Sequence, residues 1–128
     1  MRSGFISKYQ AQNDYEFEEK TSEKRFVLMI GSVRGIGYAR AKALFEDGFE
    51  IFLADISSEG MASATQLLGA VAGIVCDMGN PDQVSDMFEQ IATNYGPLHA
   101  LVNNAGIAEP GDFLSYTFEV FEEVISVC

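Results

Sequence analysis

Three glycines with a spacing suited to anion binding follow an apolar run near the start of the chain. Gly31, Gly35 and Gly37 lie in the stretch GSVRGIG, directly after the residues FVLMI. Because glycine has no Cβ atom, the backbone here can turn tightly and approach a phosphate group, which the free amides of a helix N-terminus attract. We therefore predict that this stretch binds the pyrophosphate of a dinucleotide. The candidate contacts are Gly31, Ser32, Arg34, Gly35, Ile36 and Gly37.

The glycine spacing by itself is a weak indication. It reads G-x-x-x-G-x-G, which differs from the common dinucleotide motif G-x-G-x-x-G, and it lacks the Lys-Ser/Thr end of a P-loop. A tight turn that binds no ligand is therefore the alternative interpretation of the motif alone.

An acidic residue further along the chain favours the dinucleotide. Asp55 lies 18 residues after Gly37 and directly follows a second apolar run. A carboxylate at this place can accept hydrogen bonds from the ribose hydroxyls of NAD and repels the additional phosphate of NADP. Arg34 argues the other way, because its guanidinium could pair with that phosphate, although it could equally contact an acidic side chain elsewhere. We predict NAD as the cofactor, with NADP as the second choice.

The elements that would position these residues alternate along the chain. Apolar runs at 26–30, 51–54, 70–76 and 98–102 predict strands, and the segments between them have helical periodicity. The sequence Asn80-Pro81-Asp82-Gln83 predicts a capped helix start, and Ser57 or Ser58 could cap the helix before it. This alternation predicts an α/β fold with a doubly wound, Rossmann-like parallel sheet, truncated after about four strands.

Composition bounds the other function classes. The 128 residues suit one domain, and the polar, acidic residues 1–24 predict a flexible extension before a dinucleotide-binding domain at 25–128. A net charge of −11 disfavours nucleic acid and anionic membrane as partners. Two cysteines and one histidine suggest no metal site, and no apolar run approaches the roughly 18 residues of a membrane span. We expect a cytoplasmic protein.

With these residues in view, the segment 26–128 resembles the N-terminal half of the short-chain dehydrogenase/reductase family. Four features carry the resemblance in the family's order: the stretch GSVRGIG, the acid Asp55, the stretch CDM at 76–78 and the stretch NNAG at 103–106. The resemblance implies an NAD(P)-dependent oxidoreductase that acts on a small alcohol or carbonyl compound. It also implies a homo-oligomer, because in this family the helix expected near 118–128 commonly lies in a dimer interface.

The resemblance further implies roles for individual residues. Asp77 and Met78 would border the adenine, whereas Asn104, Ala105 and Gly106 would line the cofactor cleft and stabilise the central strand. From the residues alone, Asp77 could instead cap a loop, and a purely structural role for Asn103 and Asn104 is equally consistent with the sequence.

The chain also departs from the family pattern. Ile30 stands where the family usually has threonine, and Cys128 stands where it has a catalytic asparagine. The family's catalytic serine and Tyr-x-x-x-Lys pair lie further along, and we expect none of the tyrosines here to form such a pair. His99 is interpreted as a surface residue. We therefore assign no catalytic residue and predict a cofactor-binding part without catalysis; the alternatives are a noncatalytic dinucleotide-binding module and a nonfunctional truncated product.

Overall fold

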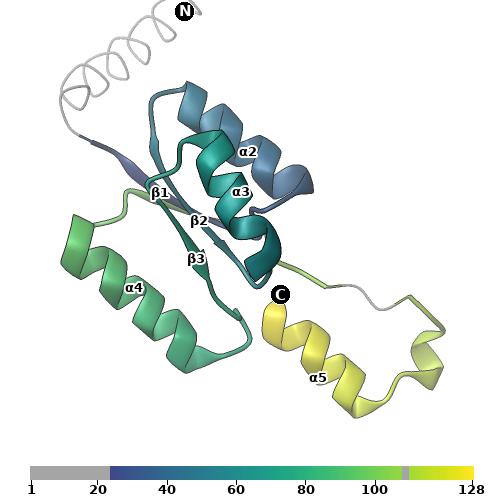
Figure 1. Ribbon diagram of the computed structural model, residues 1–128. Helices are drawn as coiled ribbons and strands as arrows, with labels where there is room; N and C mark the ends of the chain where they lie inside the picture. The colour runs from purple at the N-terminus through teal and green to yellow at the C-terminus, as the bar shows by residue number, and fades with distance from the viewer. Residues whose placement is uncertain (1–23, 108–109) are drawn as a thin grey trace, which may run out of the picture.

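The computed structural model describes residues 24–107 and 110–128, which include a parallel four-stranded sheet with helices on both faces (Figure 1). The strand order is β3-β2-β1-β4, and every pairing is parallel. The elements are β1 (Phe26–Ile30), α2 (Gly35–Glu46), β2 (Glu50–Asp55), α3 (Ser58–Leu68), β3 (Ala72–Val75), α4 (Pro81–Tyr95), β4 (Ala100–Asn103), the 3-10 turn η1 (Phe113–Ser115) and α5 (Phe118–Val127). This arrangement confirms the predicted doubly wound sheet. The extension predicted at 1–24 lies outside the described residues, apart from Lys24.

The two central strands form the core because their side chains alternate between two helical layers. One layer contains α2 and α3, and the other contains α4 (Figure 1). Toward α2 and α3 the buried residues are Val27, Met29, Ala41, Ile51, Leu53, Met61, Ala64 and Leu68. Toward α4 they are Leu28, Ile30, Phe52, Ala54, Cys76, Met87 and Ile91. The continuous apolar runs of β1 and β2 are thus explained by burial on both faces.

The two outer strands differ from the prediction. The run at 70–76 forms a strand only over Ala72–Val75, and the run at 98–102 yields a strand at Ala100–Asn103. Each has a hydrogen-bonded strand on one side only within the described sheet, so part of its surface stays exposed. Strand ends are the least certain feature of such runs because apolarity reports burial, whereas a strand also requires a neighbour with which to pair.

The helix starts follow the sequence signals in part. Asn80 accepts hydrogen bonds from the amides of Asp82 (3.1 Å) and Gln83 (3.2 Å), which confirms the predicted cap of α4. Gln83 does not close a capping box on Asn80; its Oε1 instead accepts from the amide of Asp77 at 2.9 Å. Ser57 occupies the N-cap position of α3, but its side chain makes no capping hydrogen bond. None of the described helices is long and apolar enough to cross a membrane.

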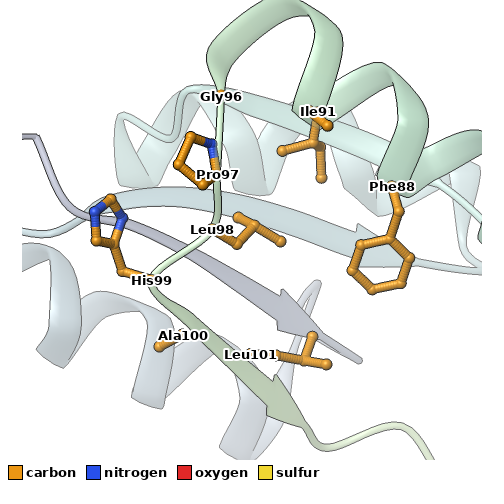
Figure 2. Close-up of a pocket in the computed structure, with 9 residues that line it drawn as sticks. Phe88, Ile91, Gly96, Pro97, Leu98, His99, Ala100 and Leu101 are labelled. Carbon is orange, nitrogen blue, oxygen red and sulfur yellow. The ribbon is translucent and has the colours of Figure 1, made fainter.

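An apolar groove of about 400 Å³ runs beside β4 and α4. Figure 2 shows Phe88, Ile91, Leu98 and Leu101 turned toward it. His99 also lines this groove, is exposed as predicted, and accepts a hydrogen bond through Nδ1 from the Phe26 amide at 3.0 Å. This part of the sheet therefore presents apolar surface that no other described element covers.

Candidate functional site

A cleft of about 520 Å³ lies beyond the carboxyl ends of the strands, where ligands bind in doubly wound sheets. Its walls come from the loops after β1, β2, β3 and β4 and from the last turns of α5. The predicted residues that line it are Gly31, Arg34, Asp55, Asp77, Met78, Asn104, Ala105 and Gly106. The fold thus brings residues from all four motifs, which are spread over positions 31–106, into one cleft.

Four other predicted residues do not line this cleft. Ser32 is fully buried, and its Oγ donates to the carbonyl oxygen of Ala54 at 3.2 Å, which gives it a structural role. Gly37 is buried within the first turn of α2. Gly35 and Ile36 are exposed at the N-terminus of the same helix. Their relation to a ligand remains a prediction.

The three glycines are required for different physical reasons. Gly31 has φ +77°, and a Cβ atom there would lie 2.8 Å from the amide nitrogen of Ala105. A Cβ at Gly37 would overlap the carbonyl oxygen of Gly31. Gly35 has φ +61° but faces open space within 4 Å, so its conformation alone favours glycine. The first and third glycines therefore permit close packing, whereas the second leaves the helix terminus accessible.

Asp55 connects the glycine turn, which we define as residues 31–37, to the end of β2. Its Oδ2 accepts from the amide of Val33 at 3.1 Å, and its Oδ1 accepts from the amide of Ser57 at 3.1 Å. A carboxylate has about four lone-pair positions, so each oxygen can still accept a second hydrogen bond. Asp55 can therefore brace the turn and also bind a ribose hydroxyl. Among the described residues that line the cleft, Arg34 is the one with a positively charged side chain, and it lies between the glycines of the motif.

Asn104 connects β4 to the same turn. Its Nδ2 donates to the carbonyl oxygen of Gly31 at 3.1 Å, and its Oδ1 accepts from Nη1 of Arg40 at 3.3 Å. Asn104 also lines the cleft, so its structural role is present and its contact with a cofactor stays a prediction. Ile30, where the family resemblance leads one to expect a threonine, packs into the core beside α4. Sequence reasoning missed Arg40, because its partner is 64 residues away.

The loop after β3 is ordered by local hydrogen bonds. The amide of Asp77 donates to Gln83, and Oδ1 of Asp77 accepts from the amide of Gly79 at 2.9 Å. Asp77 therefore does shape a loop, as the structural alternative held, while also lining the cleft. Next to it, burial raises the pKa of the Cys76 thiol, and the negative charge of Asp77 adds to this shift. A thiol held protonated in this way is a poor nucleophile.

The last turns of α5 form a wall that the sequence did not predict. Glu123, Ser126 and Val127 line the cleft. Cys128 follows them, with its Sγ 3.9 Å from the carbonyl oxygen of Ile107, so it lies beside the segment that follows the NNAG stretch. The amphipathic pattern identified α5 as a helix but carried no information about which cleft its end would reach.

One expectation about catalytic spacing was wrong. Tyr38 and Lys42 do have the spacing Tyr-x-x-x-Lys, on α2. Tyr38 packs against the core beside α3, and Lys42 lies 4.0 Å from Glu46 at the exposed surface. Neither residue lines the cleft. Within the described residues, no group of histidine, cysteine and acidic side chains is arranged to hold a metal ion.

Comparison with known proteins adds a family and two relatives. A family model described as short chain dehydrogenase matches residues 25–128. Tropinone reductase-like 2 of Erythroxylum coca is 35% identical over 91 residues, which cover 70% of this chain and 33% of that protein. A 3-alpha-(or 20-beta)-hydroxysteroid dehydrogenase of Mycobacterium tuberculosis is 31% identical over 104 residues, which cover 80% of this chain and 40% of that protein.

A solved structure resembles the fold. YwfH, described as an NADPH dependent reductase involved in bacilysin biosynthesis, superimposes with a TM-score of 0.74 at 22% sequence identity. The match covers 82% of this chain and 46% of YwfH. This chain thus spans between a third and a half of the length of the relatives described here.

Proposed function

The chain belongs to the short-chain dehydrogenase family, and from this membership we propose that it forms the dinucleotide-binding part of an NAD(P)-dependent oxidoreductase. The observation that carries the proposal is the position of the glycine turn. It lies at the carboxyl edge of the sheet, and Gly31 lines one cleft together with Asp55 and Asn104. When bound, the nicotinamide would exchange a hydride with an alcohol or carbonyl substrate.

The residues present fit a dinucleotide. No described side chain caps the N-terminus of α2, so its amides and the positive end of the helix dipole are available to a pyrophosphate. Gly35 leaves open space in front of them. Asp55 would accept hydrogen bonds from the ribose, while Asp77 and Met78 would flank the adenine. Ala105 and Gly106 would line the cofactor cleft.

Proton transfer to a substrate oxygen requires a group within hydrogen-bond reach. Among the described residues, none that lines the cleft is a tyrosine or a lysine, and the Tyr-x-x-x-Lys spacing of Tyr38 and Lys42 lies outside it. We therefore propose that these residues bind the cofactor and do not by themselves complete the reaction. The same observation favours a second candidate, a noncatalytic dinucleotide-binding module. Saturable NADH binding without turnover of any alcohol or carbonyl compound by the complete natural protein would support this second function.

We propose NAD over NADP as the cofactor. Asp55 presents negative charge where the additional phosphate of NADP would lie, and its two backbone contacts hold it there. Arg34 lines the same cleft, and YwfH is described as NADPH dependent, so the preference must be measured directly. The cytoplasmic location and the absence of nucleic acid and membrane partners stay predictions.

A matched pair of glycine variants tests dinucleotide binding. Gly35 and Gly48 both have positive φ, and a Cβ atom at either would meet nothing within 4 Å. Each change to alanine should therefore cost about 1–2 kcal/mol of folding free energy through backbone strain. Only Gly35→Ala places a methyl group at the proposed phosphate site, so it should weaken NADH binding about tenfold or more in calorimetric titration, while Gly48→Ala should bind as the parent does. Equal affinities of the two variants would overturn the proposal.

A charge change tests the cofactor preference. Asp55→Asn removes the negative charge and turns one acceptor into a donor that faces a backbone amide, so we expect NADH to bind about tenfold more weakly. The ratio of the NADPH to the NADH dissociation constants should fall. Asp86→Asn removes the same charge from the exposed surface of α4 and is the control. If Asp55→Asn leaves that ratio unchanged, Asp55 does not select the cofactor.

A further inference from the structure

Arg40 reaches the glycine turn through one intermediate side chain. Its Nη1 donates to Oδ1 of Asn104 at 3.3 Å, and Nδ2 of Asn104 donates to the carbonyl oxygen of Gly31 at 3.1 Å. These two bonds join α2, the loop after β4 and the turn after β1. Arg40 itself does not line the cleft. Any influence on a ligand must therefore pass through Asn104 and the backbone that Asn104 holds.

This connection forms in only one orientation of the Asn104 amide, with its NH₂ group toward Gly31 and its oxygen toward Arg40. The Gly31 carbonyl oxygen can only accept, so it requires the NH₂ end. The guanidinium of Arg40 can only donate, so it requires the oxygen end. Arg40 thus favours the orientation of the amide that keeps the bond to Gly31. That carbonyl is also the group a Cβ at Gly37 would overlap, so its position is set within the tightest part of the turn.

No later residue can replace Arg40 in this role. From residue 43 to residue 128 the sequence contains neither lysine nor arginine. Lys42, two residues along the same helix, lies beside Glu46 instead. Lys24 and Arg25 precede β1 and so lie at the opposite edge of the sheet from the turn that follows it.

We propose that Arg40 is a positioning residue of the dinucleotide site. It orients the amide of Asn104, which in turn fixes the Gly31 carbonyl and so holds the glycine turn in the conformation that receives a pyrophosphate. The inference rests on the proposed function for its ligand. It assigns to Arg40 a part in binding that requires no contact with the dinucleotide.

Titration with NADH tests this positioning role. Arg40→Met should raise the dissociation constant about three- to tenfold, which is the effect expected from losing one exposed hydrogen bond of ordinary strength. Lys42→Met removes the same charge from the same helix and should bind NADH within about twofold of the parent. Asn104→Ala should weaken binding by itself, and adding Arg40→Met to it should cause little further loss, because the two residues act in series. If Arg40→Met weakens binding equally in the presence and absence of Asn104, Arg40 acts through its charge and the proposal is wrong.

A measurement without ligand separates this inference from the proposed function. In the NMR spectrum of the ligand-free 128-residue chain, the side-chain amide of Asn104 should give two distinct proton signals that exchange slowly with solvent. Arg40→Met should accelerate that exchange, and Lys42→Met should not; Arg40→Leu, which also has no donor, is the second variant if the methionine variant fails to fold. Failure of the parent to bind NADH, with this exchange pattern intact, would refute the proposed function alone. Unchanged exchange in both Arg40 variants would refute the positioning role.

Discussion

Two regions of the molecule differ in how many of their side chains contact other described residues. Around the glycine turn, Asp55 bonds two backbone amides and Asn104 bonds a carbonyl and a guanidinium. On α5, by contrast, Phe118, Phe121 and Ile125 are about half to two-thirds exposed. The groove beside β4 is likewise open. The first region completes its own contacts, whereas the second presents apolar surface without a described partner.

The difference follows from which other elements each region lies against. The turn is held by contacts at the ends of three adjacent strands, which the sheet brings together at one edge. The apolar face of α5 is not covered by another described element, and exposed apolar patches of this kind are typical of interaction sites. The edge of the sheet around Gly31 therefore makes its contacts within the described residues, whereas the apolar face of α5 stays exposed.

The strongest test of this contrast places a methyl group in each region. Gly37→Ala would drive a Cβ into the Gly31 carbonyl and to within 2.8 Å of Nδ2 of Asn104. We expect a loss of about 3 kcal/mol in the free energy of unfolding, because packed backbone cannot yield at this point. Urea denaturation followed by circular dichroism measures it.

Gly106→Ala is the matched change near α5. Its Cβ would meet the Sγ of Cys128 at 3.6 Å, which is an ordinary van der Waals contact. The free energy of unfolding should change by no more than about 0.5 kcal/mol. Equal losses in the two variants would show that the regions do not differ in packing as described.

The sequence alone was sufficient for the sheet and for much of the site. β1 and β2 were predictable because burial on both faces produces continuous apolar runs, and Gly31 and Asp55 could be placed because each directly follows such a run. The parallel alternation then put the ends of these strands at one edge. This reasoning uses only local patterns and one general rule of topology.

The missed features all depend on contacts between distant segments. The bond from Arg40 to Asn104 spans 64 residues, and no local pattern marks either side chain as its partner. The contribution of Ser126 to the cleft depends on where the end of α5 lies, which its amphipathic pattern does not determine. Ser32 was predicted to contact a ligand; it is buried and donates to the carbonyl oxygen of Ala54, and its contact with a ligand stays a prediction.

Self-association through α5 gives the next largest expected effect. We propose that Phe121 and Ile125 contribute to a contact between copies of the chain, because both are exposed on one face of the helix. Changing both to glutamine should shift sedimentation toward the monomer. The free energy of unfolding of the monomer should change by about 1 kcal/mol or less, since both side chains are about half exposed or more. Glu119→Gln is the control on the same helix, and a parent chain that is monomeric at all concentrations would contradict the proposal.

The two cysteines give the prediction with the smallest expected effect. Cys76 is buried, whereas Cys128, directly after α5, is exposed. Burial, and then the charge of Asp77, raise the pKa of Cys76 above 9.0, so iodoacetamide should label it at least about tenfold more slowly than Cys128 at pH 8.

A raised pKa means that the folded state holds this proton more tightly than the unfolded state. The resulting stabilisation is complete below pH 9.0 and is lost as the pH rises through the folded-state value. The free energy of unfolding should therefore decline less between pH 8 and pH 10 in Cys76→Ala than in the parent or in Cys128→Ala; equal declines would show that burial does not hold this proton.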